Sequence, residues 1–160
     1  MKFLGIDQSY SSTGVVLIEN DTVLDFQKFT SDKSKDIFER CWDVVAQIRQ
    51  YMQKHNPDYI ALEGLAFGMM GNATRDLAGL QFSIITVARY IDLINIDIVT
   101  PLTLKKFATG NGKAKKDDMM ASLPTETLEM FKNKGFKKTT GLADLADAYF
   151  LAKFMQDKHK

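Results

Sequence analysis

The feature that most constrains the fold is an N-terminal pair of apolar runs separated by a small polar turn. Residues 2–6 and 14–19 are short, apolar and bounded by turn-forming residues, a pattern typical of paired strands. The first run ends in Asp7. A carboxylate at the end of a core strand is unfavourable unless it is paired, hydrated or bound to a cation. Asp is also a favoured turn residue. The hairpin alone therefore leaves two interpretations of Asp7 open, a turn residue or a ligand.

The apolar periodicity of the remaining chain predicts an α/β fold. A tight turn at Asn20-Asp21 leads into a third strand, Thr22–Phe29, so the first three strands form an antiparallel meander. The pattern then predicts a helix from a cap at Ser31-Asp32 to His55, a strand at 59–62, a helix at 72–93 and a strand at 96–99. A short helix follows from Thr100-Pro101, and then a helix at 113–123. The chain ends with a turn from Thr125 or Thr127 towards Phe131, a mobile link at 133–140 and a last helix at 142–156. This order predicts a five-stranded mixed sheet, three antiparallel strands then two parallel, with helices on both faces.

The size and composition of the chain restrict its class. A length of 160 residues is most simply one domain, 1–160. One cysteine, Cys41, and two histidines argue against an internal disulfide and against a zinc site of Cys and His ligands. No stretch reaches the roughly 20 apolar residues of a membrane span, and the N-terminus is typical of a strand rather than a signal peptide. We therefore expect a cytoplasmic protein with no membrane partner.

The net charge of +1 conceals a segregated basic segment. From Leu104 to Lys138 there are nine lysines against four acidic residues, a local charge of +5, which leaves −4 on the remainder. Such a segment suits a polyanionic partner such as a nucleic acid. Composition alone favours the other explanation, a solvated lysine-rich surface.

Three further acids stand at positions that complement Asp7. Glu63 ends the apolar strand at 59–62, and Asp144 and Asp147 are spaced to share one face of the last helix. The helix dipole also explains Asp144, whereas Asp147 precedes a mostly apolar run. Ligand sites of open sheets gather at the carboxyl ends of strands. Four such carboxylates without a Cys/His cluster indicate a hard-cation site for Mg²⁺ or Mn²⁺. Two such ions would clamp a phosphodiester for attack by water.

Three groups of residues form a recognisable pattern: Gly5-Ile6-Asp7 with Ser9 and Thr13-Gly14; Glu63 after an apolar strand with Asp144-x-x-Asp147-Ala148; and Gly110-Asn111-Gly112-Lys113-Ala114-Lys115-Lys116 with Lys105 upstream. On these residues the chain resembles the RuvC-type Holliday junction resolvases of the RNase H-like superfamily. The central segment is similar to the family's Gly-x-Gly-x-Ala-x-Lys segment, and Lys105 stands at the matching upstream lysine. The resemblance spans nearly the whole chain in the right order. The compact size and the variation at 63–67 suggest a phage-encoded member.

The resemblance implies an enzyme, a crossover junction endodeoxyribonuclease. It implies a homodimer, formed through the helix at 72–93, that binds four-way DNA and nicks one strand per subunit to leave 5′-phosphate ends. The implied site residues are the catalytic metal ligands Asp7, Glu63, Asp144 and Asp147, holding two Mg²⁺ ions for which Mn²⁺ substitutes, and the DNA contacts Lys105, Lys116, Lys113, Lys115, Phe67, Ser9 and Thr13. Lysine suits a scissile phosphate because its ammonium is a compact point charge. The small residues from Ser9 to Thr13 would let a phosphate backbone approach Asp7.

Phe67 has three interpretations. In the family, an aromatic residue a few positions after the acid of the fourth strand wedges between bases, and Phe67 stands one position further along than that pattern. An apolar wedge in a base step is physically reasonable. The alternatives are a core residue or a dimer contact shared with Met69 and Met70.

Three other functions compete with junction resolution. An RNase H-like nuclease with the same acids could instead cut flaps, Y-branches or RNA–DNA hybrids. An actin-like ATPase or sugar kinase also has Gly-Ile-Asp on its first strand, but it needs a second lobe and further glycine-rich loops that the sequence lacks. A non-catalytic junction-binding module would lack the acids that are present here.

Overall fold

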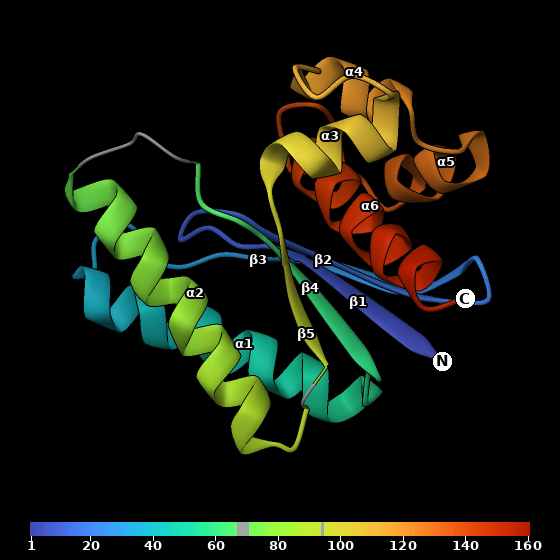
Figure 1. The fold of residues 1–160 in the computed structure, drawn as a ribbon. Helices are drawn as coiled ribbons and strands as arrows, with labels where there is room; N and C mark the ends of the chain where they lie inside the picture. Colours follow the sequence, from blue (N-terminus) through green and yellow to red (C-terminus); the bar gives the residue numbers. More distant parts are fainter. Residues whose placement is uncertain (67–70, 94) are drawn as a thin grey trace.

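The sheet is the centre of the fold in the computed structural model, which describes residues 1–66, 71–93 and 95–160. Its strand order is β3-β2-β1-β4-β5 (Figure 1). The strands are β1 (Lys2–Asp7), β2 (Thr13–Glu19), β3 (Thr22–Phe29), β4 (Tyr59–Glu63) and β5 (Ile96–Val99). Strands β1, β2 and β3 pair antiparallel, and β4 and β5 join them in parallel with β1. The predicted mixed sheet is confirmed.

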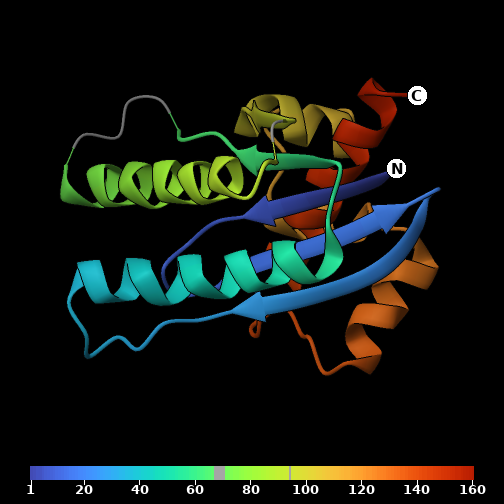
Figure 2. The same cartoon turned by 90° about the horizontal axis from the view of Figure 1, so that it is seen from below.

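Helices cover both faces of the sheet (Figure 2). They are α1 (Ile37–His55), α2 (Asn72–Tyr90), α3 (Pro101–Thr109), α4 (Lys116–Ala121), α5 (Thr125–Asn133) and α6 (Leu142–Lys158). Helices α1 and α2 lie side by side on one face, and α6 crosses the other face with α3, α4 and α5 beyond it. Among the described residues, no helix has the length and apolar character needed to cross a membrane.

Alternation along β1 divides the hydrophobic core between the two faces. Phe3 packs in the cluster formed with α6, whereas Leu4 and Ile6 pack in the cluster formed with α1 and α2. This division follows from the period of two along a strand, because successive side chains point to opposite faces. Each fully buried Leu or Ile of this kind contributes roughly 1.5–3 kcal/mol to stability. Asp7, in register with Phe3, therefore belongs to the α6 face.

The first helix begins later than the sequence predicts. We expected a cap at Ser31-Asp32, but Asp36 is the residue that caps α1, accepting hydrogen bonds from the backbone N–H groups of Phe38 and Glu39 at 2.8 and 2.9 Å. The Asp32 carboxylate instead accepts from the backbone N–H of Ser34. An Asp at either position can accept hydrogen bonds from free backbone N–H groups. Asp32 does so within a local turn, which leaves Asp36 to cap the helix.

Two other predicted helices are too long, and the link before α6 is ordered by turns. The expected helix at 113–123 is only α4, because the Asp118 carboxylate accepts from the Lys115 backbone N–H and holds that residue outside the helix. The expected helix at 72–93 ends at Tyr90. Within 133–140, predicted to be a mobile link, the Lys137 carbonyl accepts from the N–H groups of both Thr140 and Leu142.

Candidate active site

Two of the predicted acids lie at adjacent strand ends. Strands β1 and β4 are parallel neighbours with Ile6 opposite Leu62, so Asp7 and Glu63 both follow at the same edge of the sheet. Ala61 packs in the cluster with α6. Because side chains alternate along a strand, Glu63 and Asp7 are both directed to the α6 face. The parallel pairing therefore brings together two acids that are 56 positions apart.

Two glycines allow α6 to approach this edge closely. A Cβ atom on Gly5 would overlap the carbonyl oxygen of Ala148, and a Cβ atom on Gly14 would lie 2.6 Å from the carbonyl oxygen of Asp144. Real side chains do not tolerate such contacts, so α6 can rest directly on β1 and β2 only because both positions are glycine. The first turns of α6 carry Asp144 and Asp147, which are delivered to the same edge as Asp7.

The electrostatics of the acids show that they share one site. Burial raises the pKa of Asp7 well above its ordinary value, and the negative charges of Asp147, Glu63 and Asp144 raise it further. Burial also raises the pKa of Glu63. Burial followed by repulsion from Glu63 and Asp144 raises the pKa of Asp147 to about 7. The four predicted carboxylates thus interact with one another in a partly buried environment.

Two of the predicted lysines complete the site. The positive charge of Lys116, at the start of α4, lowers the pKa values of Asp7, Glu63 and Asp147. Lys105 on α3 lowers the pKa values of Glu63 and Asp147. These two lysines therefore lie close enough to the acids to act on the same bound group.

The donor set fits a hard divalent cation. The four groups supply only carboxylate oxygens, which Mg²⁺ and Mn²⁺ prefer, and a cation between them would relieve both their repulsion and their burial. Among the described residues, no three His, Cys, Asp or Glu side chains already surround a point at metal-binding distance. Closure around an ion therefore requires side-chain rotation from these positions.

The turn between β1 and β2 is held together by its own side chains. The Thr13 hydroxyl donates to the Ser9 carbonyl and accepts from the Ser9 N–H, at 2.6 and 3.0 Å. The Ser9 hydroxyl accepts from the N–H groups of Ser11 and Ser12. Thr13 is fully buried, so the expected DNA contact through its side chain is not available in this arrangement. Ser9 is half-buried, and the hydroxyl of Thr13 holds the Ser9 backbone in the turn.

Three residues of the site were not predicted from the sequence. Ser12 donates its hydroxyl proton to a carboxylate oxygen of Asp144 at 2.5 Å. Gln8 and Gln81 each donate a side-chain N–H to the backbone carbonyl of Glu63, at 2.7 and 2.8 Å, and both side chains are buried. The β1–β4 ladder stops at Leu62, so these amides satisfy a carbonyl that the sheet leaves free. The position of Gln8, directly after the Asp that ends the first strand, was the available sequence signal.

The remaining predicted DNA contacts are two lysines before α4 and one aromatic residue after β4. Lys113 and Lys115 are exposed on the segment between α3 and α4, immediately before Lys116. Their contact with DNA remains a prediction. Phe67 lies outside the described residues, and so do its possible companions Met69 and Met70.

Comparison with known proteins decides the family. Residues 3–152 match the family described as "Crossover junction endodeoxyribonuclease RuvC". The chain belongs to the RuvC family. The predicted family, enzyme class and Holliday junction function are thereby confirmed.

RuvC-family proteins of known sequence and structure are similar along most of the chain. A crossover junction endodeoxyribonuclease RuvC of Synechococcus sp. (strain WH7803) is 26% identical over 132 residues, covering 79% of this chain and 83% of the relative. The Thermus thermophilus RuvC structure superposes with a TM-score of 0.75 at 16% identity, covering 99% of this chain and 97% of that one. T. thermophilus RuvC in complex with Holliday junction substrate gives a TM-score of 0.75 at 17% identity, covering 95% and 90%. These structural similarities establish the RuvC-type fold.

Proposed function

We propose that this RuvC-family chain resolves four-way DNA junctions by metal-dependent hydrolysis, with Asp7, Glu63, Asp144 and Asp147 as the ligands of two Mg²⁺ ions. The observation that carries the proposal is the mutual electrostatic interaction of these four carboxylates at one edge of the sheet. A site built only of carboxylates, in which burial raises the pKa values of Asp7, Glu63 and Asp147, is a functional-site signature rather than a stabilising arrangement. Mn²⁺ has the same ligand preference and is expected to substitute.

The metal ions would supply an activated water on one side of the phosphodiester and stabilisation of the leaving 3′ oxygen on the other. The chain's own groups prepare this site in two ways. The sheet fixes the backbone positions of the acids on β1 and β4, and the packing at Gly5 and Gly14 fixes the backbone positions of those on α6. Rigid positioning of this kind lowers the cost of bringing the reacting groups together.

Lys105 and Lys116 bind the scissile phosphate in this proposal. Lys105 is supplied by α3 and Lys116 by α4, and both helices pack against α6, so the two lysines belong to the same side of the sheet as the acids. A phosphate bound there would be attracted by both lysines, while the metal ions would offset its repulsion by the acids. The exposed Lys113 and Lys115 extend the same charge along a DNA backbone, so we expect binding to weaken steeply with salt.

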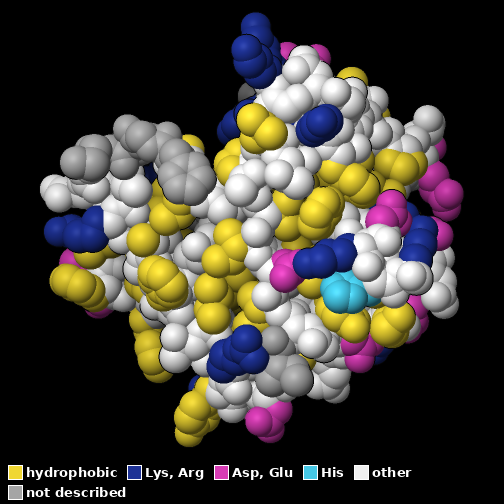
Figure 3. All heavy atoms as spheres, in the orientation of Figure 1, with side chains coloured by type: hydrophobic (Ala, Val, Ile, Leu, Met, Phe, Trp, Pro, Cys, Tyr) yellow, Lys and Arg dark blue, Asp and Glu magenta, His cyan; other side chains and the backbone are white. Residues whose placement is uncertain are grey.

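We propose that the active form is a homodimer, assembled through α2 together with α1. Four large side chains on these helices, which we call the aromatic face, are exposed by between 65% and 82%: Phe38 and Trp42 on α1, Phe82 and Tyr90 on α2. Hydrophobic side chains gather along α2 in Figure 3. Phe38, Trp42 and Phe82 also line a hollow of about 440 Å³ between the helices. Exposed apolar patches of this kind mark protein interfaces.

A two-fold dimer would present two copies of the site to one junction. Each subunit would cut one strand, so paired nicks follow from the symmetry of the dimer. The aromatic face lies on the α1 and α2 side of the sheet, whereas the acids face α6. Dimerisation through this face would therefore leave both sites accessible to DNA.

Incubation with synthetic substrates tests the function. Purified protein would be mixed with a four-way junction, a flap, a Y-branch and an RNA–DNA hybrid of matched sequence, with Mg²⁺ or with EDTA. The proposal predicts symmetric nicking of the junction in Mg²⁺, ligatable 5′-phosphate ends, and no cutting in EDTA. Cutting of the hybrid alone would refute junction resolution, and cutting in EDTA would refute the metal site.

A further inference from the structure

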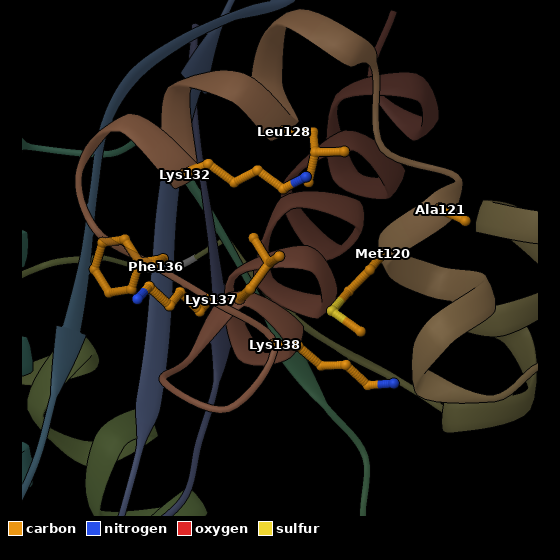
Figure 4. Close-up of a pocket in the computed structure, with 8 residues that line it drawn as sticks. Met120, Ala121, Leu128, Lys132, Phe136, Lys137 and Lys138 are labelled. Carbon is orange, nitrogen blue, oxygen red and sulfur yellow. The ribbon is translucent and has the colours of Figure 1, made fainter.

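A second recessed surface lies beside the start of α6. It is a hollow of about 500 Å³ lined by Met120 and Ala121 of α4, Leu128 and Lys132 of α5, Phe136, Lys137 and Lys138 of the segment before α6, and Leu142 of α6. Figure 4 shows the three lysine side chains arranged around the apolar ones. None of these residues belongs to the proposed metal site. We call this surface the lysine-rimmed hollow.

The walls of the hollow are held in place by packing and hydrogen bonds. Met120 and Leu142 are buried in the core formed with α6. Phe136 packs edge-on against Phe26 at 5.9 Å between ring centroids. The backbone carbonyl of Lys137 accepts hydrogen bonds from two following N–H groups, which fixes the segment that carries two of the lysines. The hollow is therefore formed in the free protein, which reduces the cost of ordering it when a ligand binds.

The rim of the hollow carries unneutralised positive charge. Lys132 and Lys137 are exposed and form no ion pair with the described residues. Lys138 pairs with Asp117 at 2.8 Å, but both side chains are about two-thirds exposed. Exposed pairs of this kind are worth little, so Lys138 can exchange Asp117 for another carboxylate. An anionic ligand would therefore meet up to three ammonium groups.

The floor of the hollow distinguishes between anionic ligands. Its surface comes from Met, Ala, Leu and Phe side chains, which need an apolar partner to leave water. The outer surface of a DNA duplex offers phosphates and sugars, which would satisfy the lysines and leave this floor uncovered. A peptide with carboxylates on either side of a large apolar side chain satisfies both. We propose that the lysine-rimmed hollow binds an acidic peptide segment of a partner protein, with one large apolar side chain inserted between α4 and α5.

This arrangement would tether the nuclease to a partner without blocking the metal site. Leu142 lines the hollow, whereas Asp144 and Asp147 lie further along α6 and face the sheet edge. Peptide binding and cutting are therefore separable, and the proposal does not depend on the function proposed above.

Fluorescence anisotropy with a labelled probe peptide tests the proposal. The probe is a short run of aspartates around a central Phe-Leu pair, and the control peptide replaces Phe-Leu with Ser-Ser. We expect Lys132→Glu and Lys137→Glu each to weaken binding of the probe about tenfold. Leu128→Asn should weaken it similarly, since it removes apolar floor without changing charge. Lys54→Glu on α1, also at an exposed position, is the matched control and should bind as the wild type does.

Four outcomes would overturn the proposal. The first is equal binding of the Phe-Leu and Ser-Ser peptides, and the second is no detectable binding of the probe peptide. The third is probe binding that neither lysine substitution weakens. The fourth is that Lys132→Glu and Lys137→Glu weaken binding of the four-way junction and leave peptide binding unchanged. The last result would assign the rim to the DNA backbone. Circular dichroism of each variant confirms that it is folded, so that a lost peptide signal reports the hollow itself.

Discussion

The side-chain amide of Gln81 on α2 lies 2.8 Å from the backbone carbonyl oxygen of Glu63, the last residue of β4. Gln81 is buried and its neighbour Phe82 belongs to the exposed aromatic face. The helix proposed for dimerisation is therefore hydrogen-bonded to the strand end that presents a proposed metal ligand.

Gln81→Met should weaken metal binding about tenfold, because partners that orient a ligand typically contribute that much or more to metal affinity. Titration with Mn²⁺, followed by the electron paramagnetic resonance signal of the free ion, measures this directly. Gln156→Met is the matched control, since Gln156 is equally buried but bonds to Asp21 instead. Both variants should lose about 1 kcal/mol of stability. Equal Mn²⁺ affinity in the two variants would contradict the positioning role of Gln81.

Lys116→Met should lower the cleavage rate by about a hundredfold, because it removes a positive charge close to the developing charge on the phosphate. Junction binding should weaken much less, since many other lysines remain. Lys106→Met provides the comparison, because Lys106 is exposed on α3 and does not influence the pKa values of the acids. Similar cleavage by the Lys116 and Lys106 variants would remove Lys116 from the site.

Phe82→Glu should convert the protein from dimer to monomer, because it places a charge at the centre of the aromatic face. Size-exclusion chromatography with light scattering measures the mass of each species. Leu24→Glu changes an exposed apolar residue on the edge strand β3 and should leave the mass unchanged. A dimer that persists in Phe82→Glu, and in the companion variant Trp42→Glu, would place the interface elsewhere.

Asp147 should make the metal-free protein less stable as the pH rises. Its pKa is about 7 in the folded chain and 3.8 as an ordinary value, so between these values the native state binds more protons than the unfolded state. The free energy of unfolding therefore falls with rising pH across that window and is lowest above it.

Urea unfolding in EDTA at several pH values tests this dependence. Asp147→Asn should reduce the difference in stability between pH 5 and pH 8, leaving the part due to Asp7 and Glu63, and should be the more stable protein at pH 8 by at least about 1 kcal/mol. Asp157→Asn, an exposed position on the same helix, should retain the wild-type dependence. An unchanged pH profile in Asp147→Asn would show that its carboxylate is ionised throughout.

Much of the fold and the four acids could be predicted because each depends on local patterns. Apolar runs that end in an acid placed Asp7 and Glu63 at strand ends, and a spacing of three placed Asp144 and Asp147 on one helix face. The cap at Thr100, which accepts from the Thr103 N–H, was equally local. The lysines Lys105 and Lys116 came from the family resemblance, and their electrostatic effect on the acids is consistent with it.

The contacts that support the site could not be predicted, because their partners are distant in sequence. Ser12 bonds to Asp144 across 132 positions, and Gln81 bonds to a backbone carbonyl that carries no sequence signal. Other predictions were wrong because neighbouring residues could fill the same structural role. Asp32 and Asp36 are both good helix caps, and only the packed structure selects Asp36. Thr13 was expected to contact DNA, but its side chain is buried and its hydroxyl is hydrogen-bonded to the Ser9 backbone.

Cleavage of a four-way junction by Asp7→Asn shows whether the four carboxylates form the catalytic metal site. Gel analysis of a labelled junction in Mg²⁺ measures cutting, and a mobility shift in EDTA measures binding on the same preparation. We expect Asp7→Asn to bind the junction as the wild type does but to cut it at least about a hundredfold more slowly, while Asp157→Asn retains both properties. Wild-type cutting by Asp7→Asn would show that the four carboxylates are not the catalytic metal site.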